Sequence, residues 1–302
     1  MMDLHPLAGV YAAAVTPLNP DSSLDLESVP LLIRFLASRG CHGALFFGTT
    51  GEGPSFSPTE RETLMREAIH DQKQYPNFRF LAGTGTPSLS ETIQLTKLAF
   101  DLGYDGVVVL PPYYFRTSTD DGLFNWYSEL IKKTVPSDGF LLGYHIPGTA
   151  GIGLSFELLV RLKDAFPSQF AGIKDSSGNG NLVQALGRRF GSDLLVLTGT
   201  DSDLQFSMQN HAQGCITAAA NLISPILREA WNLMQAGKDI TELQARITRQ
   251  RKALESYSPF SSAMKALLYR VYDFPRWSVR PPLMSLSAKD EEKLLAEFQS
   301  VK

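Results

Sequence analysis

The sequence predicts a single parallel (β/α)₈ barrel with a helical extension at its C-terminal end. Short apolar runs alternate with longer amphipathic stretches eight times within about 230 residues, a pattern typical of parallel α/β folds. Polar, glycine-rich segments recur directly after the apolar runs. The chain has 302 residues, of which 43% are hydrophobic, and this length suits one barrel with an extension. A doubly wound sheet also alternates, so periodicity alone leaves that architecture open.

Four strand–helix units are expected in the first half of the chain. The strand candidates are Gly9 to Val15, His42 to Phe47, Phe78 to Ala82 and Gly106 to Leu110. The helix after the first strand carries its apolar residues on one face and ends at Gly40. Ser57 to Glu60 and Ser88 to Glu91 are typical of the capping boxes that begin helices, and proline follows Ser57. A fourth helix is expected around Leu123 to Lys133.

The second half repeats the alternation and then becomes helical. The strand candidates are Phe140 to Tyr144, Phe170 to Lys174, Leu194 to Leu197 and Gly214 to Ala218, with helical stretches between them and a last one near Ile226 to Gln235. The remaining helices are expected at Glu242 to Tyr257, Ser262 to Tyr272 and Ala288 to Val301. We therefore predict a barrel domain at residues 1–237 and an extension, packed on the barrel, at residues 238–302.

Composition excludes several classes of partner. The net charge is −3, with 28 basic and 31 acidic residues and no basic block, which argues against nucleic acid or an anionic membrane. The N-terminal stretch lacks the basic region of a signal peptide, and no apolar run approaches the roughly 20 residues that cross a bilayer. We expect a cytoplasmic protein in which Cys41 and Cys215 are reduced core residues. The five histidines show no HxH or HExxH spacing, so no metal site is expected.

The polar segments lie where barrel enzymes place their active sites, at the C-terminal ends of the strands. They are Gly48 to Glu52, Gly83 to Gly85, Pro112 to Tyr114, Tyr144 to Pro147, Lys174 to Gly178 and Gly199 to Asp201. Because these ends converge in a parallel barrel, we expect the chemistry of the protein to be found there.

Lys174 ends the apolar run Phe-Ala-Gly-Ile-Lys, and an unpaired ammonium is costly to bury. Burial lowers the pKa of a lysine, and a neutral amine can attack a ketone to form an imine. The protonated imine then serves as an electron sink for a carbanion on the next carbon. From this run alone, however, the ordinary alternative is favoured: the side chain reaches solvent or pairs with Asp175.

Three further sequence features lie at the predicted strand ends. Tyr144 ends the preceding strand, so its hydroxyl could move protons at the same barrel mouth, although rim tyrosines are common. Gly48-Thr49-Thr50-Gly51-Glu52 offers two hydroxyls and several backbone N–H groups, which can hold a carboxylate, although glycine and threonine often mark only a loop. Tyr113 and Tyr114 follow two prolines, which predicts a rigid aromatic loop that could reach a neighbouring subunit.

Together these segments resemble the dihydrodipicolinate synthase/N-acetylneuraminate lyase family of class I aldolases. The matching pieces, in order, are Thr16-Pro17, GTTGE at 48–52, AGTG at 82–85, PPYY at 111–114, YHIPGTAG at 144–151, GIKDSSG at 172–178, GCITAAAN at 214–221 and Arg280-Pro281-Pro282-Leu283. The resemblance covers most of the chain. It implies a (β/α)₈ barrel that works through a covalent imine with its substrate, without a cofactor or a metal.

The resemblance also implies residue roles. Lys174 matches the Schiff-base lysine and Tyr144 the proton-transferring tyrosine. Thr49 and Thr50, next to Gly48, match the pair that holds the pyruvate carboxylate, and Thr49 would link Tyr144 to Tyr114 in a proton relay.

Two further positions follow from the same likeness. Tyr114 matches a tyrosine that the family commonly donates across a dimer interface. Ile216 matches a position whose backbone borders bound pyruvate. The likeness predicts a homodimer or homotetramer.

Departures from the family pattern bear on the second substrate. Thr149 stands where synthases that bind aspartate semialdehyde usually carry an arginine, and threonine cannot replace a guanidinium clamp on a second carboxylate. His145 stands where asparagine is common. Gly199-Thr200-Asp201-Ser202 has the aspartate, but not the following glutamate, of sialate lyases. Small and hydroxyl residues at 148–151, with Ser176, Gly199 and Asp201, suit a hydroxylated 2-oxo acid.

We therefore predict reversible aldol cleavage of a 2-oxo-3-deoxy sugar acid, or a similar 4-hydroxy-2-oxo acid, to pyruvate and an aldehyde. The synthase that condenses pyruvate with aspartate semialdehyde stays an alternative, since a cation can arrive from elsewhere and Arg116 is one candidate. A sugar-acid dehydratase and a catalytically silent protein that binds a 2-oxo acid are further alternatives.

Overall fold

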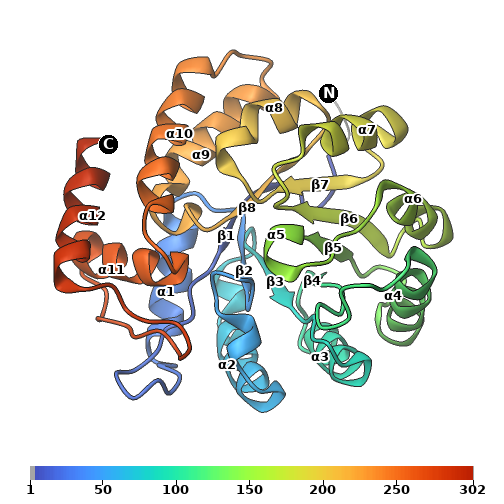
Figure 1. Cartoon of the computed structure of the whole chain (residues 1–302), viewed down its shortest axis with the longest axis horizontal. Coiled ribbons are helices and arrows are strands. Elements are labelled where there is room, and N and C mark those ends of the chain that lie inside the picture. Colours follow the sequence, from blue (N-terminus) through green and yellow to red (C-terminus); the bar gives the residue numbers. More distant parts are fainter. Residues whose placement is uncertain (1–3, 302) are drawn as a thin grey trace. The chain divides into compact units, whose positions relative to one another are not determined.

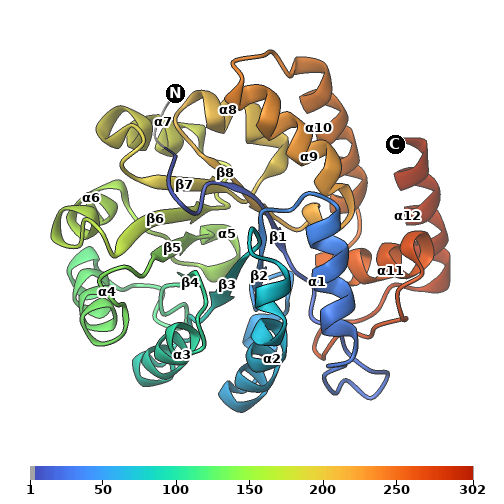
Figure 2. The same cartoon turned by 180° about the vertical axis from the view of Figure 1, so that it is seen from behind.

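A computed structural model describes residues 4–301. Its eight parallel strands form a closed barrel in chain order, and helices alternate with them along the chain (Figure 1, and from behind in Figure 2). The strands are β1 Gly9–Ala13, β2 Gly43–Phe46, β3 Arg79–Gly83, β4 Gly106–Val109, β5 Leu141–His145, β6 Phe170–Asp175, β7 Leu195–Thr198 and β8 Gly214–Thr217. The predicted fold class is confirmed, and the doubly wound alternative, in which the strand order reverses, is excluded.

Most helices with predicted bounds agree with them to within three residues, but α9 begins at Ala220, six residues before the predicted Ile226. They are α1 Ser28–Ser38, α2 Pro58–His70, α3 Leu89–Asp101, α4 Asp120–Thr134, α5 Pro147–Ala150, α6 Phe156–Ala165, α7 Gly180–Phe190, α8 Leu204–Gln209, α9 Ala220–Gln235, α10 Thr241–Glu255, α11 Phe260–Tyr272 and α12 Ala288–Ser300. The 3₁₀ turns η1 Gly53–Ser55, η2 Gln72–Gln74 and η3 Asp201–Asp203 complete the order. Helices α5 and α8 are shorter than an amphipathic pattern can resolve.

Side-chain caps mark the starts of several helices, including the two for which the sequence predicts a capping box. The Ser57 hydroxyl accepts from the Glu60 N–H at 3.3 Å, and the Glu60 carboxylate accepts from the Ser57 N–H at 2.9 Å. This reciprocal pair confirms the predicted capping box of α2. At α3, the Ser88 hydroxyl accepts from the Glu91 N–H at 3.3 Å, so the first of the two expected bonds is present there.

The chain divides into two compact units, and each is described by itself. Of the described residues, the first unit comprises 4–9 and 79–215, and the second comprises 10–78 and 216–301. Within the second unit, α9 contacts α10 and α11, the Ser278 N–H donates to the Leu18 carbonyl at 3.2 Å, and Trp277 Nε1 donates to the Asp25 carboxylate at 3.0 Å. The C-terminal helices therefore pack on the β1–α1 segment, whereas the domain boundary at residues 237–238 stays a prediction.

The two cysteines behave as the sequence predicts. Both Cys41 and Cys215 are buried and form no disulfide. Burial raises the pKa of the Cys41 thiol to about 12, so it stays protonated and is a poor nucleophile at neutral pH. No helix within residues 4–301 is long and apolar enough to cross a membrane. The cytoplasmic location stays a prediction.

Acidification is expected to destabilise the protein through His42, whose Nδ1 accepts from the Val10 N–H at 2.9 Å. Burial, with the nearby Arg228 acting in the same direction, lowers the pKa of His42 from 6.5 to about 4. The unfolded chain therefore binds more protons than the native state between these values, and the free energy of unfolding falls as the pH falls from 6.5 to 4. A thermal midpoint measured at pH 7.5 and 4.5 should fall less in His42→Gln, whose amide stays neutral, than in the unmodified protein. An equal fall in both would contradict this assignment.

Candidate active site

Lys174 and Tyr144 are brought together at the ends of neighbouring strands in the first unit. Strands β5 and β6 pair in parallel, with Tyr144 directly opposite Lys174. In-register neighbours point to the same face of a sheet. Lys174 is 3% exposed and Tyr144 is 4% exposed, and Lys174 Nζ lies 4.2 Å from the centroid of the Tyr144 ring. The sequence prediction that both side chains share one strand end is confirmed.

The ordinary alternatives for Lys174 fit the structure poorly. Its side chain is buried and so does not extend into bulk solvent. Asp175 follows it on the strand, where successive side chains point to opposite faces, and its carboxylate accepts the Ser177 N–H at 2.9 Å. Within residues 4–301, no carboxylate lies within ion-pair distance of Lys174 Nζ.

His145 fixes the turn that follows β5. Its Nδ1 accepts from the Leu154 N–H at 2.8 Å, and its carbonyl accepts from the Ser176 N–H at 2.8 Å. Burial lowers the pKa of His145, although the Asp175 carboxylate acts in the opposite direction. A neutral imidazole keeps Nδ1 free to accept that bond at pH 7. His145 therefore ties the segment that carries Thr149 to the end of β6.

Arg116 lies against the same turn. Thr149 is exposed on α5, and Gly151 ends that helix with φ 69°, a left-handed conformation that favours glycine. A Cβ atom on Gly151 would come within 2.7 Å of Arg116 Nε, so the Arg116 side chain packs directly on the Gly151 backbone. Arg116 is exposed and forms no ion pair within the described chain. A guanidinium thus lies beside the turn whose own sequence contains no arginine.

Ser176, Gly199 and Asp201 occupy the next two strand ends of the first unit. A Cβ atom on Gly199 would collide with Ser176 Oγ, so these two residues are in close contact. The Gly199 N–H also donates to the Asp175 carbonyl at 2.6 Å. Asp201 is buried at the start of η3. The structure brings Ser176 and Gly199 together, while a contact of Asp201 with substrate stays a prediction.

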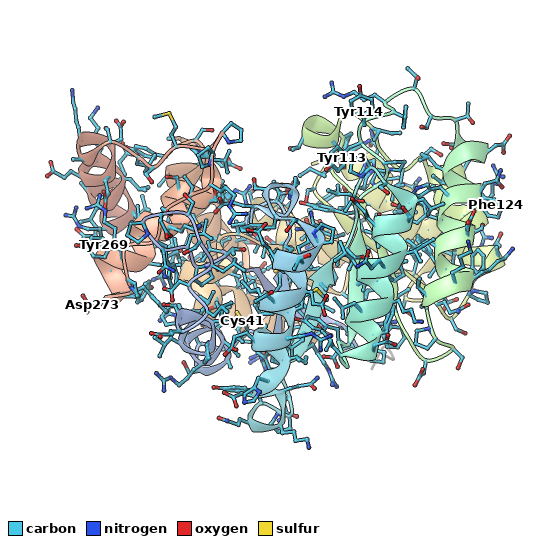
Figure 3. The ribbon with its side chains drawn as sticks, turned by 90° about the horizontal axis from the view of Figure 1, so that it is seen from below. Cys41, Tyr113, Tyr114, Phe124, Tyr269 and Asp273 are labelled. Carbon is cyan, nitrogen blue, oxygen red and sulfur yellow. The ribbon has the colours of Figure 1, made fainter. Side chains whose placement is uncertain are left out.

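The tyrosine loop projects from the first unit. Figure 3 shows Tyr113 and Tyr114 near one another at one edge of the molecule. Tyr114 is 76% exposed, and its ring meets Phe115 edge-on with 5.3 Å between the ring centroids. An exposed aromatic pair is typical of a surface that meets a partner. Its place in a subunit interface stays a prediction.

The second unit holds the remaining predicted residues. In its β2–α2 loop, Gly48 and Thr50 are buried and Thr49 is exposed, and Ile216 is buried on β8. Backbone bonds close the loop: the Glu52 N–H donates to the Thr49 carbonyl and the Gly53 N–H to the Gly48 carbonyl, both at 3.1 Å. The approach of these groups to Lys174 stays a prediction.

Sequence reasoning missed the group that holds this loop. Lys265 on α11 and Glu52 form an ion pair with 2.5 Å between Nζ and Oε1, and both side chains are almost completely buried. Burial lowers the pKa of Lys265, although the Glu52 carboxylate acts in the opposite direction. The signal that could have revealed the pair is a lysine on the apolar face of a helix, between Met264 and Leu268.

A metal is not indicated by the side chains that the structure describes. No group of three or more histidine, cysteine, aspartate or glutamate residues within 4–301 could hold an ion. At the ends of β5 and β6, the described titratable side chains are instead Lys174, Tyr144, His145 and Asp175.

Comparison with known proteins gives one consistent result. The model of the Dihydrodipicolinate synthetase family matches residues 6–300. An uncharacterized DapA-like lyase of Chloroflexus aurantiacus is 31% identical over 97% of this chain and 96% of its own. A 4-hydroxy-tetrahydrodipicolinate synthase of Sorangium cellulosum is 34% identical over 74% of this chain and 72% of its own. Among solved structures, dihydrodipicolinate synthase of Agrobacterium tumefaciens has a TM-score of 0.87 at 32% identity, covering 97% and 99% of the two chains.

Proposed function

The chain belongs to the Dihydrodipicolinate synthetase family and is therefore a carbon–carbon lyase, and we propose that Lys174 forms its Schiff base with a 2-oxo acid such as pyruvate. Enzymes of this family join a lysine to the substrate in a Schiff base and use no cofactor. The observation that carries the assignment is the buried Lys174 amine, which has Tyr144 beside it and no acidic partner within the described chain.

The proposed chemistry begins when the neutral Lys174 amine attacks the ketone carbon of the 2-oxo acid. The carbinolamine then loses water, with its hydroxyl taking a proton, to give an imine that withdraws electrons from the neighbouring carbon. Removal of the C4 hydroxyl proton and breaking of the bond between C3 and C4 release an aldehyde and leave an enamine on Lys174. The enamine then takes a proton at C3, and water hydrolyses the protonated imine to release pyruvate and the Lys174 amine. Tyr144, which neighbours the amine, is the group that we assign to take and return these protons.

Thr49 and Thr50 are proposed to hold the carboxylate of the 2-oxo acid, with Gly48 and Ile216 bordering it. Hydroxyls and backbone N–H groups in a tight loop suit a carboxylate. Thr49 and Tyr114 complete the proposed proton relay. The exposed Tyr114 ring supports a homodimer or homotetramer in which it reaches a partner's site.

For the second half of the substrate we propose a hydroxylated aldehyde, so that the substrate is a 2-oxo-3-deoxy sugar acid or a similar 4-hydroxy-2-oxo acid. Thr149, Ser176, Gly199 and Asp201 are polar or small and follow β5, β6 and β7 in the first unit. Hydroxyl-bearing side chains and a carboxylate can exchange hydrogen bonds with a polyhydroxylated chain.

One observation favours a second function, the condensation of pyruvate with aspartate semialdehyde. Arg116 packs on Gly151 without an acidic partner in the described chain, and so offers a guanidinium beside Thr149. Arginine is suited to bidentate binding of a carboxylate. Several relatives, including the Sorangium cellulosum protein, are named 4-hydroxy-tetrahydrodipicolinate synthases.

A pair of assays is expected to separate these functions. Release of pyruvate from a series of 2-oxo-3-deoxy sugar acids, followed with lactate dehydrogenase, should reach a kcat/KM of roughly 10⁴ M⁻¹s⁻¹ for at least one of them. Condensation of pyruvate with aspartate semialdehyde should be slower, because Thr149 offers the second carboxylate no charge-assisted bond.

The outcome that would reverse this preference involves Arg116. Efficient condensation that falls by about 10- to 100-fold in Arg116→Met, the loss expected from one charge-assisted hydrogen bond, would establish the synthase function instead. Arg188→Met, which removes an exposed arginine on α7, is the matched control.

A further inference from the structure

The loop that carries Thr49 and Thr50 has a tightly determined backbone. Glu52 adopts a left-handed conformation with φ 56°, which is unfavourable for a residue other than glycine. The Thr16 hydroxyl donates to the Gly51 carbonyl at 2.6 Å, and the Arg61 guanidinium donates to the Gly53 carbonyl at 2.5 Å. Conformations of this kind persist where the surroundings determine them, and they occur often at ligand-binding sites.

The bonds that hold the Glu52 side chain come from the C-terminal part of the chain. The Glu52 carboxylate is 0% exposed, and its Oε1 lies 2.5 Å from Lys265 Nζ on α11, which is 2% exposed. Its other oxygen, Oε2, accepts from the Arg280 N–H at 2.8 Å. Lys265 Nζ in turn donates to the Ser278 carbonyl at 2.7 Å. Both carboxylate oxygens are therefore bound by residues that lie beyond the predicted barrel.

Stability alone does not account for a buried pair of this kind. Desolvating two charges costs so much that well-packed apolar side chains of similar volume are often as stable or more stable. A buried ion pair does fix the orientation of its two side chains, because the charges attract each other well only in one geometry. Glu52 is two residues from Thr50, and its N–H is bonded to the Thr49 carbonyl, so a change in the position of Glu52 moves both threonines.

We propose that Lys265 is a positioning residue for substrate, which acts through Glu52 to hold Thr49 and Thr50 in the geometry that binds the carboxylate of the 2-oxo acid. The C-terminal extension then contributes to substrate positioning, besides its packing on the β1–α1 segment. The proposal rests on the proposed function of Thr49 and Thr50, and it adds a residue that touches no substrate.

The test uses the double variant Glu52→Gln/Lys265→Met, which removes both charges while keeping the shapes similar and leaves no unpaired buried charge. The measured quantity is the pyruvate concentration that gives half-maximal borohydride-trapped adduct on Lys174, together with the KM and kcat of turnover. We expect that concentration and the KM to rise about tenfold or more, with kcat changing much less, since displaced binding groups weaken substrate positioning. Arg66→Met, which removes the exposed Arg66–Glu62 pair on α2 of the same unit, should leave both values unchanged.

A lower melting temperature with an unchanged half-saturating pyruvate concentration would show that the pair is only structural and would overturn the proposal. If the double variant does not fold, Lys265→Arg tests the proposal in its place. It keeps the positive charge, but its larger head group displaces the Glu52 carboxylate. It must raise the half-saturating concentration as well, and an unchanged value would overturn the proposal. Failure of the unmodified protein to trap pyruvate at any concentration would instead contradict the proposed function itself.

Discussion

Replacement of Lys174 by alanine is expected to abolish the borohydride-trapped pyruvate adduct and to lower turnover by about 10⁴- to 10⁶-fold, the range seen when a covalent nucleophile is removed. The reason is that the imine is the only electron sink that the proposed mechanism provides. Mass spectrometry of tryptic peptides after treatment with pyruvate and borohydride should place the adduct on Lys174 in the unmodified protein and nowhere in the variant.

Folding controls make this result decisive. Lys174→Ala removes a buried amine without an acidic partner in the described residues, so its melting temperature should stay the same or rise. Lys133→Ala removes an exposed lysine that pairs with Glu129 on α4, and it should keep the full adduct. A Lys174→Ala protein that traps pyruvate at full yield would rule out the assignment.

Tyr144→Phe is expected to lower kcat by about 10²- to 10⁴-fold, the usual contribution of one general acid–base group. The substitution keeps the ring that lies 4.2 Å from Lys174 Nζ and removes only the hydroxyl. The borohydride adduct should therefore still form on Lys174, but more slowly. Stopped-flow or quench measurement of adduct formation, alongside steady-state turnover, separates imine formation from bond cleavage.

Tyr127→Phe is the matched control, because Tyr127 is also buried in the first unit and its hydroxyl donates to the Val109 carbonyl at 2.9 Å. Losing that bond should cost about 1 kcal/mol of stability and leave the rate of adduct formation unchanged. A Tyr144→Phe variant that behaves like Tyr127→Phe would show that the Tyr144 hydroxyl has no part in proton transfer.

The placement of Lys174 beside Tyr144 could be predicted because each residue has a local signal in the sequence. Lys174 and Tyr144 each end an apolar run, and adjacent parallel strands in register place such residues on one face. Capping at Ser57 was equally local, since a cap involves residues three positions apart. Patterns of this kind can be recognised from the sequence, because the interacting residues are close in the chain or recur with the period of their helix or strand.

Other predictions needed the folded chain. The possible pairing of Lys174 with Asp175 is decided by the alternation of side chains along β6, which points the two side chains to opposite faces. The packing of Arg116 on Gly151 joins two loops that sequence reasoning considered separately. Neither result could be predicted from residue type, because exposed arginines and strand aspartates have many alternative partners.

The sequence by itself was enough to predict the barrel, most of its strands and helices, the family and the lysine at the end of β6. Hydrophobic periodicity, helix caps and motifs each depend on residues that are close together in the chain. The tertiary structure alone decided that Lys174 is buried without an acidic partner within residues 4–301, and that Glu52 pairs with Lys265 across 213 positions of the chain. Which side chains are buried, and which charges pair, depend on which distant segments of the chain come into contact. The energy of a charge depends on what surrounds it in the folded chain, and that environment is formed only when these segments pack together.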